Sequence, residues 1–184
     1  MRKYYPDVED IQDPKYPTSK GKDIQVTIFC DSNYGHNLKD RRSITGIVIF
    51  LGTTPYRWFS KRQTSVETST FGAEFAVLRV AVEEAIVTAN TLRSIGVSVR
   101  KPIRILCDNK GVVDNSTIPG SSLKKKHTSI AYHKTREVIA SGLAVIYHMD
   151  GTENPADVLT KPLDKMSFLK HVGRLMSGQS LRMS

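Results

Sequence analysis

The sequence contains few of the residues that cross-link small extracellular domains or bind zinc. Its 184 residues include only two cysteines, Cys30 and Cys107, and no Cys-x-x-Cys pair. Two thiols are too few for a disulfide framework or a tetrahedral zinc site. The sequence also lacks an apolar run of membrane-spanning length, and its first residues lead into acids and prolines instead of an apolar signal segment. We therefore expect an intracellular protein that folds around a hydrophobic core and has no membrane partner.

Acidic residues are the scarcer of the two charge types. Lys and Arg number 27 against 18 Asp and Glu, which gives a formal net charge of +9. A basic balance of this size favours polyanionic partners, nucleic acid first. The net charge is equally compatible with a basic protein that binds no polyanion. The local sequence patterns must therefore decide between these two interpretations.

Hydrophobic patterns predict one α/β domain. Apolar residues at steps of three or four over 71–92, followed by Gly96 as a stop, predict a long amphipathic helix, and 121–142 predicts another with a basic start. The early strands can form an antiparallel meander, whereas the later strands need helical crossovers and are expected to be parallel. The expected fold is a mixed sheet with flanking helices. Alternating or continuous apolar residues predict strands at 24–30, 46–51, 57–60, 103–107 and 143–149.

The two ends of the chain are expected to lie outside this domain. Residues 1–22 carry three prolines among mixed charges without sustained periodicity, which is typical of a linker. We place the domain at 23–164 and expect a partly helical C-terminal tail at 165–184. Asn154-Pro155 is a helix-start signal, because Asn can cap free backbone amides and Pro tolerates the first helical position.

Four acidic residues occupy positions that suit a metal site. Asp31 and Asp108 each end an apolar strand, so parallel pairing of these strands would bring both carboxylates to one edge of the sheet. Glu74 shares the buried face of the helix at 71–92, where an unpaired carboxylate is unfavourable. Asp157 lies in the first turn of the terminal helix, where the helix dipole favours negative charge. Each acid alone fits an ordinary surface residue, but their joint placement on four elements favours a Mg²⁺ site with oxygen ligands.

The motifs around these acids resemble the ribonuclease H domains of copia-type (Pseudoviridae) retrotransposon polyproteins. The similarity runs from about Gly21 to Leu163 with the motifs in family order. The chain departs from the family at Phe71-Gly72, where Thr and Glu are usual, and at Thr128-Ser129, which replaces Ile-Asp; neither change removes one of the four acids. The matching motifs are DSNYG at 31–35, RRSITG at 41–46, WFSKRQ at 58–63, the helix segment at 69–75, DNK at 108–110, the KH and YH pairs within 126–133, and ADVLTKPL at 156–163.

The resemblance implies a ribonuclease H-like fold with a five-stranded sheet. It also implies an endonuclease that hydrolyses the RNA strand of RNA–DNA hybrids by two-metal-ion catalysis. By motif, Asp31, Glu74, Asp108 and Asp157 bind two Mg²⁺ ions, for which Mn²⁺ can substitute. The implied partners are the hybrid and an upstream reverse transcriptase domain of the same polyprotein, and the implied location is the cytoplasmic virus-like particle or the nucleus.

Basic residues are the candidates for substrate binding. Recognition of a hybrid depends mainly on the backbone and the ribose 2′-hydroxyls, so we expect phosphate contacts and low sequence specificity. A run of basic residues is also compatible with an ordinary solvated surface. The predicted nucleic-acid-binding residues are Arg41, Arg42, Lys124, Lys125, Lys126 and His127.

His148 is a further candidate catalytic residue. It lies at the end of the last predicted strand, nine positions before Asp157. Many cellular and retroviral ribonucleases H, which this layout resembles, place a mobile-loop His about that far ahead of the last Asp, although the copia-type pattern usually lacks it. The alternative is an exposed strand-end His with no catalytic role.

Three other side chains are expected to be structural. Trp58 is the only tryptophan, and its place within a strand favours core or boundary packing over base stacking. Cys30 and Cys107 precede the two strand-end acids and are expected to be buried free thiols that can lie close together.

Two other functions are compatible with this sequence. A domesticated or decayed copy would be a non-catalytic nucleic-acid-binding module that keeps the fold and the basic surface. A transposase or integrase core shares the fold but transfers DNA strands. Intact acids at all four positions argue against the first alternative, and Asp157, where an integrase would carry Glu, argues against the second.

Overall fold

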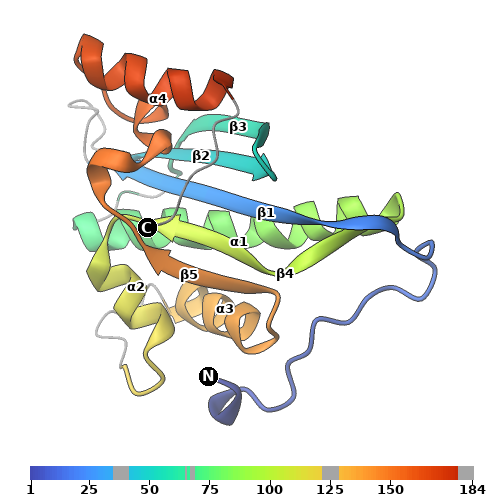
Figure 1. The fold of residues 1–184 in the computed structure, drawn as a ribbon. Helices are drawn as coiled ribbons and strands as arrows, with labels where there is room; N and C mark the ends of the chain where they lie inside the picture. Colours follow the sequence, from blue (N-terminus) through green and yellow to red (C-terminus); the bar gives the residue numbers. More distant parts are fainter. Residues whose placement is uncertain (35–41, 65, 67–68, 122–128, 178–184) are drawn as a thin grey trace.

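A five-stranded mixed sheet forms the centre of the molecule (Figure 1). The computed structural model describes residues 1–34, 42–64, 66, 69–121 and 129–177. The strand order is β3-β2-β1-β4-β5, with the first three strands antiparallel and β1, β4 and β5 parallel to one another. The predicted class, an antiparallel meander followed by parallel strands, is confirmed. The strands are β1 (Lys20–Asn33), β2 (Ile44–Leu51), β3 (Thr54–Arg62), β4 (Val97–Cys107) and β5 (Ala144–His148).

Helices cover both faces of the sheet. The main core lies between the sheet and the helices α1 and α3, and a smaller cluster around Phe29 and Phe50 lies on the opposite face beneath η4 and α4. In Figure 1, α4 lies beside β3, at the far edge of the sheet from α3. None of the described helices has the length and apolar composition of a membrane span. The helices are η1 (Arg2–Tyr4), α1 (Thr70–Ser94), α2 (Lys110–Thr117), α3 (Ser129–Ala140), η3 (Gly151–Glu153), η4 (Pro155–Leu159) and α4 (Lys165–Ser177).

Local sequence signals explain where α1 begins and ends. The Ser69 hydroxyl accepts a hydrogen bond from the Gly72 backbone N–H and caps the first turn. Gly96 follows the helix with a φ of 78°, a left-handed conformation that glycine adopts without strain. The long helix predicted from the apolar stripe is therefore confirmed, and it carries Glu74 on its buried face.

The expectations for Asn154 and for Trp58 differ from the structure. Asn154 caps a helix as predicted, but that helix is η4, which ends at Leu159; Pro162, whose ring disfavours a continuing helix, separates it from α4. Trp58 was expected in or at the core, and this was wrong, because 61% of its surface is exposed. β3 is one of the two edge strands and pairs on one side only, and its residues are mostly exposed.

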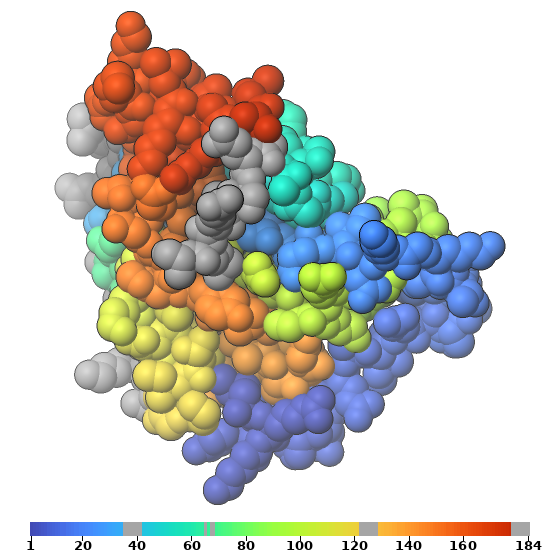
Figure 2. All heavy atoms as spheres, in the orientation of Figure 1, coloured from blue at the N-terminus to red at the C-terminus, as the bar shows by residue number. Residues whose placement is uncertain are grey.

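The segment before β1 is packed against the domain. Asp10 forms ion pairs with the buried Arg93 near the end of α1 and with Lys101 of β4, each with a 2.6 Å nitrogen–oxygen distance. The Tyr5 hydroxyl lies 2.8 Å from Nδ1 of His133. Figure 2 shows the N-terminal residues lying against the lower part of the domain. That residues 1–22 link two domains remains a prediction.

Candidate active site

The pairing of β1 with β4 brings Asp31 and Asp108 together. Cys30 and Cys107 are aligned in the parallel register of these strands, so Asp31, which still pairs with β2, lies beside Asp108, which directly follows the end of β4. Asp31 is fully buried and Asp108 is half-buried. Both cysteines are buried free thiols, as expected. The sequence therefore located two carboxylates at one edge of the sheet correctly.

Glu74 reaches the same edge from α1. Its carboxylate, the Cys107 thiol and the Asp108 carboxylate have ligand atoms within 4.8 Å of one another. Glu74 is 5% exposed, and among the described residues its Oε2 atom has no hydrogen-bond partner. Burial, with added repulsion from the charges of Asp31 and Asp108, raises the pKa of Glu74 to about 8.

Asp157 completes the cluster from η4. One carboxylate oxygen from each of Asp31, Asp108 and Asp157 lies within 4.8 Å of the others. Burial and the charge of Asp31 raise the pKa of Asp157 to about 6. This 3-10 helix can approach β2 because residue 46 is glycine: a Cβ there would lie 2.6 Å from the Thr160 methyl group. The joint placement of the four predicted acids is therefore observed, and metal binding by them remains a prediction.

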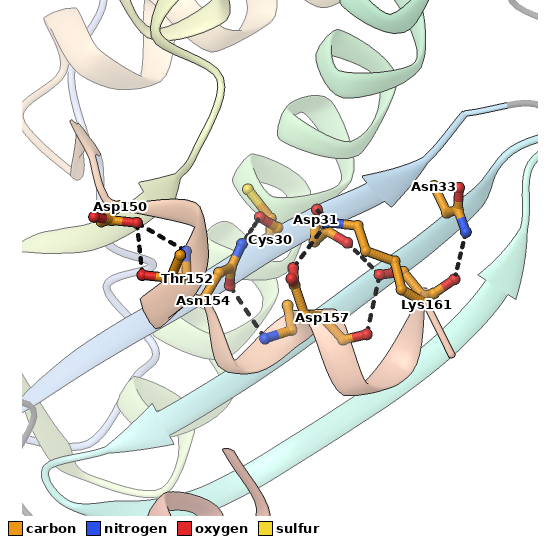
Figure 3. A network of polar contacts seen from close by, with 10 residues as sticks. Cys30, Asp31, Asn33, Asp150, Thr152, Asn154, Asp157 and Lys161 are labelled. Carbon is orange, nitrogen blue, oxygen red and sulfur yellow. Dashed lines mark hydrogen bonds and ion pairs between the residues drawn. The ribbon is translucent and has the colours of Figure 1, made fainter. Parts of the chain in front are cut away.

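The structure adds two residues to the cluster that the sequence did not single out. The Lys161 ammonium group lies 3.1 Å from Oδ1 of Asp31 and 3.0 Å from Oδ1 of Asp157 (Figure 3). The Thr160 hydroxyl donates a hydrogen bond to the other oxygen of Asp31. Burial opposes the charge on Lys161, but the two carboxylates raise its pKa well above the ordinary value. The four-residue spacing of Asp157 and Lys161, which brings two side chains together when the intervening chain forms a helical turn, was the available signal.

Asparagine side chains attach η4 to the end of β1. Asn154 is fully buried; its Nδ2 donates to the Cys30 carbonyl at 3.0 Å, and its Oδ1 accepts from the Ala156 N–H at 3.1 Å. At the other end of η4, Asn33 Nδ2 donates to the Thr160 carbonyl at 3.0 Å. The sequence predicted Asn154 only as a helix cap. Both ends of the segment that carries Asp157 are thus fixed to the strand that carries Asp31.

His148 lies beside the acidic cluster. Its Nε2 atom is 3.1 Å from the Asp108 carbonyl oxygen, and the residue is exposed. The structure therefore brings His148 to the edge where the sequence placed it, and its catalytic role remains a prediction.

Most of the predicted basic contacts fall outside the described residues. Arg41, Lys124, Lys125, Lys126 and His127 all lie there, whereas Arg42 is half-buried two residues before β2. The described residue before the 122–128 segment is held firmly: the carbonyl of Ser121 accepts a 2.6 Å hydrogen bond from the Tyr132 hydroxyl, and its own hydroxyl accepts from Arg136. Phosphate binding by these residues remains a prediction.

The donor set of the cluster fits a divalent cation. Four carboxylates from four elements supply the oxygen ligands that Mg²⁺ and Mn²⁺ prefer. Two observations indicate that the cluster lacks positive charge. Oε2 of Glu74 has no hydrogen-bond partner among the described residues, and burial together with the charge of Asp31 raises the pKa of Asp108.

Solved structures with a similar fold are ribonucleases H. The N-terminal ribonuclease H domain of rv2228c from Mycobacterium tuberculosis matches 82% of this chain and 97% of its own, with a TM-score of 0.57 and 15% identity. LC11-RNase H1 in complex with an RNA/DNA hybrid matches 74% of this chain and 94% of its own, with a TM-score of 0.57 and 18% identity. The chain has a ribonuclease H-like fold, as the resemblance implied.

Sequence comparison identifies the region of protein to which the chain corresponds. It is 28% identical over 156 residues to the retrovirus-related Pol polyprotein from transposon RE1 of Arabidopsis thaliana, and 26% identical over 148 residues to that from transposon TNT 1-94 of Nicotiana tabacum. These matches cover 85% and 80% of this chain, and each covers 11% of the relative. No protein-family model matches. The chain is similar to one region of these retrotransposon Pol polyproteins and spans about a tenth of their length.

Proposed function

We propose that this chain is a metal-dependent ribonuclease H that hydrolyses the RNA strand of RNA–DNA hybrids. The observation that carries the proposal is the convergence of Asp31, Glu74, Asp108 and Asp157 from four separate elements at one edge of the sheet. The similarity to retrotransposon Pol polyproteins supports it, as does the likeness in fold to a ribonuclease H crystallised with an RNA/DNA hybrid.

The four acids would hold two Mg²⁺ ions, for which Mn²⁺ can substitute. When bound, the ions would supply an activated water and stabilise the charge on the leaving oxygen. Asp31 lies close to the other three acids and is therefore placed to act on both sides of the cluster. Asn154 and the Thr160 hydroxyl fix Asp31 and η4 relative to each other, so the carboxylates are positioned before substrate arrives. Exposed His148, whose Nε2 atom lies 3.1 Å from the Asp108 carbonyl oxygen, would exchange a proton with the product.

Substrate recognition would involve the backbone of the hybrid. Arg41, Arg42 and the basic residues 124–127 would contact phosphates, which gives affinity without sequence specificity. The partner within the polyprotein would be a reverse transcriptase domain upstream of this chain. Residues 1–22 would link that domain to the ribonuclease H domain at 23–164. On this proposal the reaction takes place in the cytoplasmic virus-like particle or the nucleus.

A strand-labelled hybrid tests the proposal. With Mg²⁺ or Mn²⁺ we expect endonucleolytic cutting of the RNA strand only, leaving 5′-phosphate and 3′-hydroxyl ends, and no cutting in a chelator. Asp31→Asn and Asp108→Asn should abolish cutting with an unchanged circular dichroism spectrum. Asp114→Asn, on the exposed side of α2, is the matched control and should cut at the wild-type rate. Equal cutting of duplex DNA would overturn the proposal, and hybrid binding without cutting would favour a non-catalytic module.

A further inference from the structure

The acidic cluster has two unlike halves. Around Asp31 and Asp157 the carboxylate charge is partly compensated, because the Lys161 ammonium group contacts one oxygen of each and the Thr160 hydroxyl donates a hydrogen bond to the second oxygen of Asp31. Around Glu74 and Asp108 no described cation makes such a contact, and Oε2 of Glu74 is buried without a partner. The Lys161 ammonium group therefore contacts only the half of the site that holds Asp31 and Asp157, and it acts on Glu74 and Asp108 without direct contact.

We propose that the Lys161 ammonium group occupies the place of the second divalent ion, and that this ion can bind only when Lys161 leaves. The inference rests on the proposed metal site. The Lys161 nitrogen lies 3.1 Å from Oδ1 of Asp31 and 3.0 Å from Oδ1 of Asp157. An ion bound between Asp31 and Asp157 would need these carboxylate oxygens as ligands. An ion coordinated by these two oxygens and the ammonium group that contacts both of them would occupy the same space, so only one of the two can be present at a time. Ions consequently bind in order, first beside Glu74 and Asp108 and then in exchange for Lys161.

The lysine can leave without disturbing the fold. Its side chain is 33% exposed and reaches the carboxylates through a flexible four-carbon stem, so the ammonium group can turn into solvent. Its backbone N–H stays bonded to the Asp157 carbonyl at 3.0 Å. Lys161 thus stabilises the metal-free site and raises the metal concentration needed to fill it. It acts on the reaction through the ion and is a positioning residue.

Calorimetric titration of the metal-free chain with Mn²⁺, without nucleic acid, tests the exchange. The variants are Lys161→Gln, which removes the charge, Lys161→Arg, which keeps it, and Lys165→Gln, a control at an exposed position near the start of α4. We expect two binding steps in the wild type, the weaker of which becomes tighter by about tenfold or more in Lys161→Gln because a competing unit charge is gone. Lys161→Arg and the control should resemble the wild type. Unchanged or weaker binding by Lys161→Gln overturns the proposal.

A second measurement follows the Lys161 side chain in the unaltered chain, and the variant serves only to assign its resonance. The side-chain ammonium resonance of Lys161, assigned from its absence in Lys161→Gln, should show a buried ion pair in the metal-free chain and take on solvent-exposed character at saturating Mg²⁺. An ammonium group that stays paired at saturation overturns the exchange. Neither measurement depends on hybrid cleavage, so a chain that binds ions in this order but does not cut would contradict the proposed function alone.

Discussion

Ionisation of Glu74 should govern how the stability of the metal-free chain depends on pH. Its pKa is about 8 in the folded chain against an ordinary value of 4.5. Because the folded chain holds this proton more tightly than the unfolded chain, its stabilising effect is complete below pH 4.5 and is lost as the pH rises to about 8. The difference corresponds to roughly 5 kcal/mol, which is a large part of the about 5–15 kcal/mol that stabilises a typical domain.

Glu74→Gln isolates this effect because glutamine has a similar shape and cannot ionise. In a chelator at pH 8.5 we expect the variant to be more stable than the wild type by on the order of 3 kcal/mol or more, and by almost nothing at pH 4.5. Saturating Mg²⁺ should reverse the order, because the bound ion stabilises only a chain with the full set of carboxylates. Glu83→Gln is the control on the same helix, with a side chain that is 46% exposed.

Urea unfolding in a chelator, measured at several pH values, is the assay. Far-UV circular dichroism is the suitable signal, because the single tryptophan, Trp58, is already 61% exposed and its emission should change little on unfolding. Parallel stability-against-pH curves for the wild type and Glu74→Gln would refute the reasoning, since they would show that Glu74 ionises as easily in the folded chain as in the unfolded one.

Three further predictions concern the surroundings of the cluster. Gly46→Ala should lower stability by about 1–3 kcal/mol and slow single-turnover cleavage, because the new methyl group meets Thr160; Gly173→Ala, with open space around it, should do neither, and equal effects would contradict this. His148→Ala should lower turnover by on the order of tenfold with nearly unchanged hybrid affinity, and superimposable rates across pH would reject a role for this residue. Neutralising residues 124–126 should weaken binding to unrelated hybrid sequences and reduce the salt slope by about one for each lost phosphate contact, whereas an unchanged slope would leave them a solvated surface.

The parts of the site that were predictable are those coded by local pattern. Asp31 and Asp108 follow apolar runs, and strand pairing alone brings the ends of parallel strands together. Glu74 was identifiable because its position on the helix repeat places it on the buried stripe. In each case the hydrophobic pattern that predicts the strand or helix also predicts the side of that element on which the carboxylate lies.

The unpredicted parts depend on contacts between distant segments. In the sequence, Lys161 has the features of an ordinary exposed lysine. Only the fold brings it beside Asp31, which lies 130 positions earlier in the chain. The same holds for Asn154, whose bond to the Cys30 carbonyl depends on how η4 lies on the sheet. Trp58 shows the converse error: its strand was predicted, but a pattern within one strand does not say whether that strand lies at the sheet edge.

The docking of the N-terminal segment decides how mechanical load reaches the domain. A pull on the chain from its N-terminal side is borne first by the contacts of Arg2, Tyr4 and Tyr5 with α3. The ion pairs of Asp10 with Arg93 and Lys101 bear it next. Arg93 and Glu74 lie near opposite ends of α1, about 28 Å apart at the rise of an α-helix. Tension in a longer polypeptide would therefore be resisted at α3 and at the end of α1 that is far from Glu74, so the carboxylates would keep their spacing.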